Sequence, residues 1–347
     1  MKQTFSELPQ RILLVKMSSL GDIITALPVL AALRHFLPQA HISWAIHREF
    51  QSVLPGKPYL DEVVIVERTR INSPSYWLEL RRQLREKKFD LVLDLQMIAK
   101  SALVVALSGA SRRYGYWEAR EGAGWISRPL SGVNKYGHIT ERLLDVMREL
   151  GLPVERVEYP LATITAERYE VRQTLLNAGW NYPFVIIVPG SRGERKRWTI
   201  AQWQQVIEHI IARGVGVVVT GSASEKGMVN KICEPFPDHF VMSLAGKTNL
   251  RQLMAWESEA CLHISGDTGP LHIANALRTP IVGLYGPTLP ERSGPYAHPQ
   301  ASIVVAPQLP DRTPQMRRDD RIDMKKLTVE KVIRVIDKQL DKTNPRG

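Results

Sequence analysis

The chain has 347 residues, 44% of them hydrophobic, which is enough for two domains with their own cores and excludes a disordered protein. Lys and Arg number 46 against 35 Asp and Glu, and this surplus favours an anionic partner: nucleic acid, an acidic membrane surface or a phosphorylated substrate. Two cysteines, Cys233 and Cys261, cannot supply a disulfide framework or a four-ligand zinc site.

The N-terminal half alternates β-branched runs with amphipathic stretches, the pattern of a parallel sheet covered on both faces. We predict strands at residues 11–16, 41–46, 63–66 and 89–95, with helices at 23–36 and 77–88. The turn after the first strand is Met17-Ser18-Ser19-Leu20-Gly21-Asp22, in which Gly21 permits a sharp bend.

The same pattern restarts in the C-terminal half. We predict strands at 184–188, 214–220, 261–265 and 281–285, with helices at 166–177, 200–212, 250–257 and 327–340. The sequence therefore predicts an α/β protein with two doubly wound, parallel-sheet domains facing a cleft. We expect an N-terminal domain at 1–165, a linker region at 166–182, a C-terminal domain at 183–325, and a terminal helix and tail at 326–347.

Ligands bind beyond the carboxyl ends of parallel strands, so the residues that follow each strand are candidates for the site. After the first strand, Asp22 has two interpretations. It could cap the following helix by accepting backbone hydrogen bonds, or it could act as a general base on an acceptor hydroxyl.

The turn after strand 184–188 reads Pro189-Gly190-Ser191-Arg192-Gly193-Glu194-Arg195-Lys196-Arg197. Small residues followed by three consecutive cations suit a pyrophosphate, which needs backbone donors and compensating charge. The alternative is a solvated charged surface.

Strand 261–265 leads through Gly266-Asp267-Thr268-Gly269-Pro270-Leu271-His272 into a predicted helix start. Asp267 could cap that helix, while the Thr268 hydroxyl and the exposed N–H groups contact phosphate. His272 could instead be an ordinary, partly buried histidine. The absence of a nearby nucleophilic serine argues against a hydrolase triad.

Several motifs are absent from the sequence. There is no GxGxxG after the first strand, which argues against a dinucleotide-dependent dehydrogenase, and no GxxxxGK[ST], which excludes a P-loop NTPase. There is also no Asp-x-Asp and no His or Cys pair with metal-ligand spacing. We therefore expect no cofactor and no metal, with Lys, Arg and helix N-termini offsetting the charge of a pyrophosphate.

Taken together, these motifs resemble glycosyltransferase family 9, the lipopolysaccharide heptosyltransferases, over nearly the whole chain. The resemblance rests on Leu14-Val-Lys16-Met-Ser-Ser19-Leu-Gly21-Asp22 with Leu27-Pro28, Asp94-Leu-Gln96 with Lys100-Ser101, Lys196-x-Trp198, and Gly266-Asp267-Thr268-Gly269-Pro270-x-His272 with Gly286-Pro-Thr288. It implies the GT-B fold, two facing Rossmann-like domains, and inversion at the sugar carbon.

Within that family, Ser18 to Asp22 and Tyr116 to Glu121 resemble the heptosyltransferase I branch. That resemblance implies transfer of L-glycero-D-manno-heptose from ADP-heptose to the Kdo residue of Kdo-lipid A. It implies that Asp22 is the general base and that Lys196 stabilises the donor pyrophosphate.

The resemblance also implies two sets of binding residues. Glu225 is expected to contact the donor ribose, and Thr248 stands where related enzymes carry an apolar donor contact. The donor-binding set is Ser191, Arg192, Glu225, Thr248, Asp267, Thr268, Gly269 and His272. The acceptor-binding set, in the N-terminal half, is Ser19, Lys100, Arg120, Arg68 and Arg70. The arginines of the second set would contact carboxylates or phosphates of the acceptor, whereas Arg81 and Arg82 equally suit a solvated helix face.

The longest apolar stretch, residues 23–33, is too short to span a bilayer and lacks a signal-peptide cleavage site. We therefore expect a cytoplasmic protein that associates peripherally with the inner membrane through an anionic lipid A-type acceptor, without nucleic acid. Two alternatives remain. One is another family 9 transferase, of heptosyltransferase II or III type or using a different sugar. The other is a nucleic-acid-binding protein explained by the +11 charge, although no aromatic-basic RNA motif or recognition helix is present.

Overall fold

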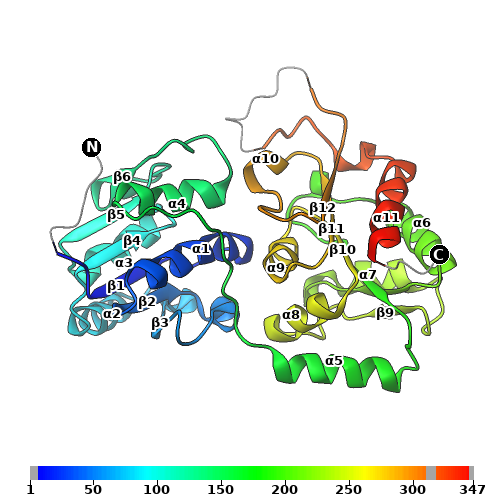
Figure 1. The fold of residues 1–347 in the computed structure, drawn as a ribbon, viewed down its shortest axis with the longest axis horizontal. Helices are drawn as coiled ribbons and strands as arrows, with labels where there is room; N and C mark the ends of the chain where they lie inside the picture. The colour runs from blue at the N-terminus through cyan, green and yellow to red at the C-terminus, as the bar shows by residue number, and fades with distance from the viewer. Residues whose placement is uncertain (1–6, 310–317, 344–347) are drawn as a thin grey trace. The chain divides into compact units, whose positions relative to one another are not determined.

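The computed structural model describes residues 7–309 and 318–343, and the chain divides into two compact units, Met1–Thr163 and Ile164–Gly347 (Figure 1). Each unit is built on one six-stranded parallel sheet with helices packed on it. The predicted α/β class with two Rossmann-like, doubly wound sheets is confirmed.

The first unit carries one sheet in the order β3-β2-β1-β4-β5-β6. Its strands are β1 (Arg11–Val15), β2 (His41–Ile46), β3 (Glu62–Ile65), β4 (Leu91–Asp94), β5 (Arg112–Tyr116) and β6 (Arg128–Leu130). Its helices are α1 (Leu20–Phe36), α2 (Pro74–Glu86), α3 (Ala99–Ser108) and α4 (Ile139–Glu149). Residues of β1 and β4 are almost wholly buried, as expected for central strands covered on both faces.

The second unit carries a sheet in the order β12-β11-β10-β7-β8-β9. Its strands are β7 (Phe184–Val188), β8 (Gly216–Val219), β9 (Val241–Ser243), β10 (Leu262–Gly266), β11 (Ile281–Tyr285) and β12 (Ala301–Val305). Its helices are α5 (Thr165–Asn177), α6 (Ile200–Ala212), α7 (Lys226–Cys233), α8 (Leu250–Glu259), α9 (Gly269–Leu277), α10 (Pro290–Ser293) and α11 (Val329–Thr343).

Both sheets have the same topology, in which the first strand of the unit lies between its second and fourth strands. The strand order therefore reverses between β1 and β4 in the first unit, and between β7 and β10 in the second. Ligands of doubly wound sheets bind at this switch point, beyond the carboxyl ends of the two strands. The fold thus directs attention to the residues that follow β1, β4, β7 and β10.

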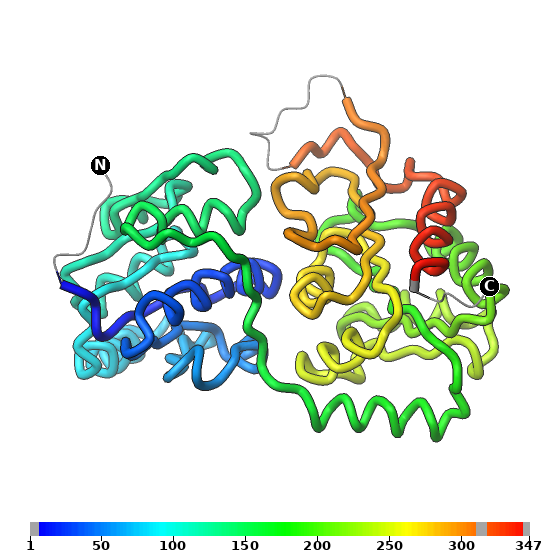
Figure 2. Tube along the Cα trace, in the orientation of Figure 1, coloured from blue at the N-terminus to red at the C-terminus, as the bar shows by residue number. Residues whose placement is uncertain are grey.

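The segment 166–182, which the sequence suggests as a linker, mostly forms α5. This helix follows residues 152–163, which form neither helix nor strand (Figure 2). α5 belongs to the second unit, where the Arg168 guanidinium contacts Glu259 of α8 at 2.6 Å and Arg251 of α8 pairs with Glu167. The C-terminal α11 packs in the same unit against α6, with Asp337 within 2.8 Å of His209 and 2.6 Å of Arg213.

In the part of the chain that the structure describes, no helix combines the length and apolar character that crossing a bilayer requires.

Candidate functional site

At the switch point of the first unit, Asp22 lies in the first turn of α1. The helix begins after Ser19, whose backbone N–H and hydroxyl donate to the Asp22 carboxylate at 3.2 and 2.6 Å. Asp22 therefore does take part in capping, but from the third helical position and not as the cap residue itself. Its side chain is 49% exposed, and its second carboxylate oxygen lies 3.9 Å from the Lys16 ammonium. Capping leaves the carboxylate accessible to a substrate.

The two residues that follow β4 fix the conformation of this loop. The Gln96 side-chain oxygen accepts the Met17 N–H at 2.7 Å, and the buried Lys16 ammonium donates to the Leu95 carbonyl at 2.9 Å. The bond to Leu95 thus holds the Lys16 ammonium at a place where it lies 3.9 Å from the Asp22 carboxylate.

Asp94, at the end of β4, holds the next turn of the chain. It accepts the N–H groups of Gln96 and Met97 and the Ser101 hydroxyl at 2.8 to 3.0 Å. Burial raises the pKa of Asp94 against the opposing effect of these donors. Sequence reasoning gave no role to Lys16 or Gln96. The available signals were a lysine ending an apolar strand and the Asp-x-Gln that follows the neighbouring one.

At the switch point of the second unit, an ion pair joins the loops after β7 and β10. The Lys196 ammonium lies 3.1 Å from the Asp267 carboxylate, and His272 of α9 lies 3.8 Å from its other oxygen. Burial alone would raise the pKa of Asp267, but the neighbouring His272 and Lys196 outweigh burial and lower it to about 2. Asp267 does not cap α9, because the cap position is Thr268.

Two buried hydroxyls flank this ion pair in the sequence. Ser191 follows β7 and Thr268 precedes α9, and within the described residues neither hydroxyl oxygen has a hydrogen-bond partner. A buried polar group without a partner costs free energy, so native proteins keep few of them. A ligand rich in oxygen atoms would supply partners to both, next to the N–H groups of Gly269 and Leu271 in the first turn of α9, where Pro270 has no N–H to donate.

Glu225 ends the short helical turn after β8 and lies against the loop that follows β7. Its carboxylate accepts the Ser222 N–H and hydroxyl at 2.8 and 2.7 Å. A Cβ atom added at Gly190 would lie 1.9 Å from one of its oxygens, which shows how closely the two loops approach. Thr248 lies half-buried in the next turn, which is held to the same edge because the Gly246 N–H donates to the Gly221 carbonyl at 2.9 Å.

The other cations of the loop after β7 point elsewhere. Arg195 donates to the Asp320 carbonyl, and Arg197 donates to the Ser191 carbonyl at 2.7 Å. Arg192 is exposed. Lys196 is thus the cation of this loop that contacts Asp267, while Arg197 braces the backbone that carries the Ser191 hydroxyl.

A buried chain of polar side chains that sequence reasoning missed ends at the same loop. The His263 ring lies 2.9 Å from the Glu257 carboxylate and 2.7 Å from the Ser265 hydroxyl, which donates to the Gly266 carbonyl. All three side chains are fully buried. The chain connects α8 to the last residues of β10 and so restrains the backbone that carries Asp267.

The predicted acceptor residues Lys100 and Arg120 come together at the carboxyl ends of β4 and β5. The Arg120 N–H donates to the Met97 carbonyl at 3.0 Å, and the Glu121 carboxylate accepts the Ala99 N–H at 3.2 Å. These bonds place the Arg120 segment beside the first turn of α3, which carries Lys100, and both side chains are exposed.

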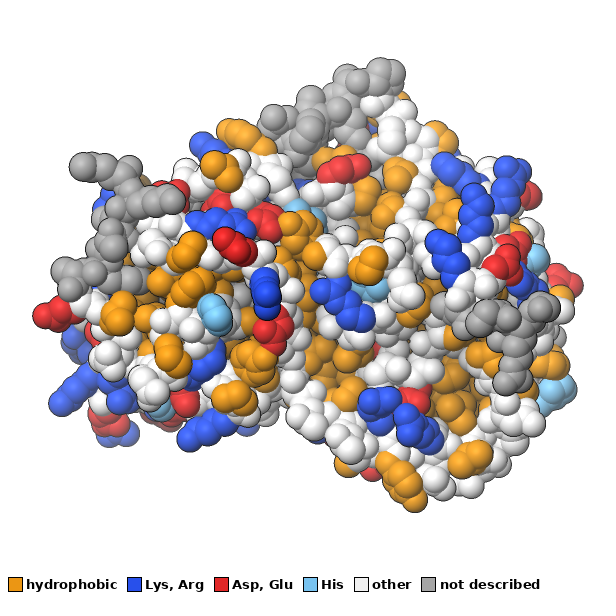
Figure 3. All heavy atoms as spheres, in the orientation of Figure 1, with side chains coloured by type: hydrophobic (Ala, Val, Ile, Leu, Met, Phe, Trp, Pro, Cys, Tyr) orange, Lys and Arg blue, Asp and Glu red, His pale blue; other side chains and the backbone are white. Residues whose placement is uncertain are grey.

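Arg68 and Arg70 follow β3, which three strands separate from β5 in the sheet order. Each faces a carboxylate: Arg68 lies 3.3 Å from Glu49, and Arg70 lies 2.8 Å from Glu79. Their placement does not join them to Lys100 and Arg120, and their role in acceptor binding stays a prediction. On the face shown in Figure 3, Lys and Arg side chains are interspersed with acidic and apolar ones over both units.

Comparison with known proteins gives consistent similarities. A family model described as Glycosyltransferase family 9 (heptosyltransferase) matches residues 77–323. Lipopolysaccharide heptosyltransferase 1 of Pseudomonas aeruginosa is 28% identical over 304 residues, which cover 84% of this chain and 83% of that protein. Lipopolysaccharide heptosyltransferase 3 of Escherichia coli is 28% identical over 279 residues, covering 77% and 81%. The solved structure of E. coli heptosyltransferase WaaC with ADP aligns with a TM-score of 0.75 at 23% identity, covering 95% of this chain and 99% of that one.

Proposed function

Because the chain belongs to glycosyltransferase family 9, the heptosyltransferases, and has their GT-B fold, we propose that it adds L-glycero-D-manno-heptose from ADP-heptose to the Kdo residue of Kdo-lipid A in lipopolysaccharide inner-core synthesis. The single observation that carries the donor half of this proposal is the set of groups at the β7–β10 switch point. There the Lys196–Asp267 ion pair joins the loops that follow β7 and β10. The same two loops carry the Ser191 and Thr268 hydroxyls, which are buried without hydrogen-bond partners among the described residues.

Each of these groups suits one part of a nucleotide diphosphate. The Ser191 and Thr268 hydroxyls and the N–H groups of Gly269 and Leu271 would donate to pyrophosphate oxygens, and Lys196 would offset the negative charge of those oxygens. Glu225 presents an acceptor oxygen at the neighbouring strand end, where ribose hydroxyls could donate to it. The similarity to E. coli heptosyltransferase WaaC, whose solved structure contains ADP, supports an ADP-linked donor.

The proposed reaction is a single displacement with inversion. Asp22 accepts the proton of the acceptor hydroxyl as that oxygen forms a bond to the anomeric carbon of heptose. The bond between that carbon and the ADP oxygen breaks, and the electron pair leaves with ADP. Lys196 stabilises the negative charge that develops on the departing diphosphate. The Lys16 ammonium lies 3.9 Å from the Asp22 carboxylate and so places a positive charge beside the proposed base.

The chain is 28% identical both to a heptosyltransferase 1 and to a heptosyltransferase 3, so the experiment that tests the proposal compares their acceptors. Mass spectrometry after incubation with ADP-heptose should show one added heptose on Kdo-lipid A. A heptosylated core acceptor, tested in parallel, should gain none. Transfer to the heptosylated acceptor alone would replace the proposal with the later-heptose alternative.

The proposal places the protein at the cytoplasmic face of the inner membrane, since it joins a water-soluble nucleotide sugar to a lipid acceptor. It also predicts retention on immobilised ADP at physiological salt but not on immobilised DNA. The reverse result would favour the nucleic-acid-binding alternative raised by the +11 charge.

A further inference from the structure

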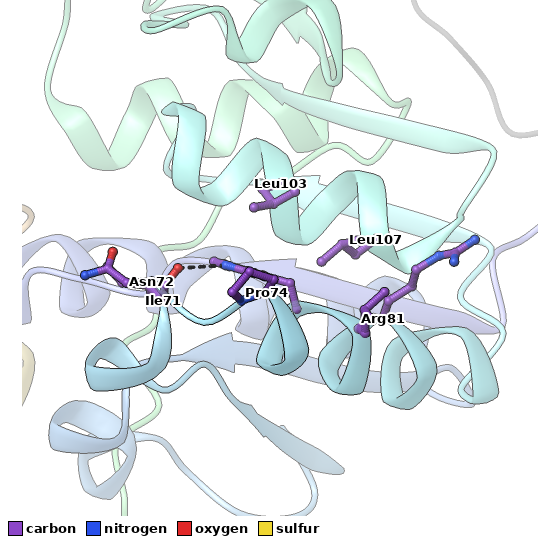
Figure 4. A pocket seen from close by; sticks show the side chains of 8 residues that line it. Ile71, Asn72, Pro74, Arg81, Leu103 and Leu107 are labelled. Atoms are coloured by element: carbon purple, nitrogen blue, oxygen red, sulfur yellow. Dashed lines mark hydrogen bonds between the residues drawn. The ribbon is translucent and has the colours of Figure 1, made fainter.

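An apolar groove of about 520 Å³ lies between α2 and α3 on the first unit (Figure 4). Its apolar lining is Ile71, Pro74, Trp77, Leu78, Leu103 and Leu107, and we call it the α2–α3 groove. In Figure 4, Leu103 and Leu107 point from α3 toward α2, with Asn72 near one end and Arg81 near the other. The Trp77 ring nitrogen donates to the Ile71 carbonyl at 2.8 Å, which fixes the indole as a wall of the groove.

Several apolar side chains of the groove are exposed and not packed into the core. α2 buries its opposite face, Tyr76, Leu80 and Leu84, against the sheet, while Leu78 remains 66% exposed. Leu103 on α3 is 40% exposed. Grouped exposed leucines beside an open hollow mark a surface that meets another apolar phase.

The rim of the groove is basic. Arg81, Arg82 and Arg85 lie exposed along α2, and the Arg85 guanidinium reaches across to the Leu107 carbonyl at 3.2 Å. Arginines beside exposed leucines match a lipid interface, where apolar side chains enter the acyl region and guanidinium groups meet phosphates. A second copy of this chain, with its own +11 charge and basic rim, would bring like charges together.

The groove also adjoins the predicted acceptor residues. Ile71 directly follows the turn that carries Arg68 and Arg70, Pro74 begins α2, and Lys100 lies in the first turn of α3. α2 and α3 both begin near the carboxyl ends of the strands they follow. A lipid whose sugar reaches this edge therefore has its bilayer within reach of the groove.

We propose that the α2–α3 groove is the surface through which this protein binds an anionic lipid bilayer. Leu78 and Leu103 enter the boundary between headgroups and acyl chains, and Arg81 and Arg82 contact lipid phosphates. The inference rests on the proposed function, because a lipid-linked acceptor is embedded in a membrane that the protein must approach. The binding itself needs no sugar acceptor.

The test is co-sedimentation of the full chain with vesicles of phosphatidylcholine and phosphatidylglycerol, without any sugar acceptor. Leu78→Glu/Leu103→Glu should lower the partition constant about tenfold or more, because each substitution removes an inserted side chain and adds a repelled charge. The matched control is Tyr169→Glu/Leu176→Glu, two side chains of α5 that are 64% and 65% exposed. It makes the same charge change in the other unit and should lower binding by about twofold at most. Arg81→Gln/Arg82→Gln should weaken binding about tenfold or more and flatten its dependence on salt.

Equal binding by the groove variant and the α5 control would overturn the proposal. So would conversion of a wild-type dimer to a monomer by the groove variant in light scattering, which would assign the groove to a second copy. Transfer assays with a deacylated, water-soluble acceptor separate this inference from the proposed function. The groove variant should keep wild-type kcat on that substrate, whereas a failed functional proposal would leave vesicle binding intact and show no transfer by any variant.

Discussion

The Lys196 ammonium and the Asp267 carboxylate lie 3.1 Å apart although 71 positions separate them in the sequence. They meet because β7 and β10 are neighbours in the sheet and both loops emerge at the same edge. The pair places a cation and an ionised carboxylate beside hydroxyls that are buried without partners, and its charge state has consequences that can be measured.

Asp267→Asn should destabilise the protein in a pH-dependent way. Since folding lowers the pKa of Asp267 to about 2, the stability it contributes is fully present above its ordinary pKa and is lost as the pH falls toward 2. In urea unfolding without ligand, the free energy of unfolding of wild type should exceed that of Asp267→Asn by about 2 kcal/mol near pH 7. This difference should narrow to about 1 kcal/mol near pH 3. Asp341→Asn removes an exposed carboxylate of α11 and should cost less than about 1 kcal/mol. A stability difference between wild type and Asp267→Asn that stays constant below pH 4 would contradict the lowered pKa of Asp267.

Ser191→Ala and Thr268→Val should each weaken ADP binding by about 2- to 10-fold in calorimetry, because each removes one donor to the diphosphate. Their thermal stability without ADP should be unchanged or slightly higher, since neither hydroxyl has a partner among the described residues. Thr279→Val provides the opposite pattern. Its buried hydroxyl donates to the Glu257 carbonyl at 2.7 Å, so this variant should lose about 1 kcal/mol of stability and bind ADP normally. If the first two variants lose stability instead, these hydroxyls serve the fold.

Asp22→Asn should lower kcat by about 10²- to 10⁴-fold, because an amide cannot accept the acceptor proton. ADP affinity should stay within about twofold, since the donor is proposed to bind the second unit. The amide oxygen can still accept the Ser19 N–H, so the melting temperature should hardly change. Asp22→Ala removes that capping contact and should also cost about 1 kcal/mol of stability. Retention of more than a tenth of kcat by Asp22→Asn would leave Asp22 with the capping role alone.

Transfer should continue in excess EDTA, because Lys196 and the N-terminus of α9 supply positive charge toward the leaving diphosphate. Lys196→Gln should weaken donor binding about tenfold or more, and added Mg²⁺ should not restore it. The measurement is initial rate against donor concentration, with and without chelator. An EDTA-sensitive rate that Mg²⁺ or Mn²⁺ restores would show that a metal shares this role.

Arg120→Ala should raise the KM for Kdo-lipid A about tenfold or more and leave the KM for ADP-heptose within about twofold, because a charge-assisted contact is lost at the acceptor only. Arg70→Ala should have a smaller effect, since Arg70 already pairs with Glu79 at 2.8 Å. Arg156, an exposed residue of the same unit, is the control and its Ala variant should behave as wild type. A rise in donor KM alone would reverse the assignment of substrates to the two halves.

The strands nearest the site were predictable because they are continuous apolar runs. Strands 184–188 and 281–285 and helix 200–212 were predicted with the bounds that β7, β11 and α6 have. The strand β5, Arg-Arg-Tyr-Gly-Tyr, was missed because its residues give no apolar pattern and its conformation depends on pairing with β4 and β6. α1 begins three residues earlier than predicted, since Ser19 and Asp22 form its cap together.

Within the candidate site, sequence patterns predicted which loops carry the site but not which side chains contact one another. The turn at Asp267 was visible as small residues between an apolar strand and a helix start. The contact between Asp267 and Lys196 could not be predicted, because it depends on the order of the strands in the sheet, which no local sequence pattern specifies. The chain from Glu257 through His263 to Ser265 was invisible for the same reason: a histidine and a serine in a strand carry no signal until a buried carboxylate from another element faces them.

The approach of Gly190 to Glu225 couples two positions of the chain that lie in different loops. A methyl group at position 190 would occupy the place of a Glu225 carboxylate oxygen, so Gly190→Ala moves the carboxylate without altering its charge. Natural variation should therefore be linked at these two sites, with a larger residue at 190 accompanied by a shorter side chain at 225. Libraries that aim to change which nucleotide the protein accepts should vary the two positions as a pair, because diversifying 225 alone leaves the space beside Gly190 unfilled.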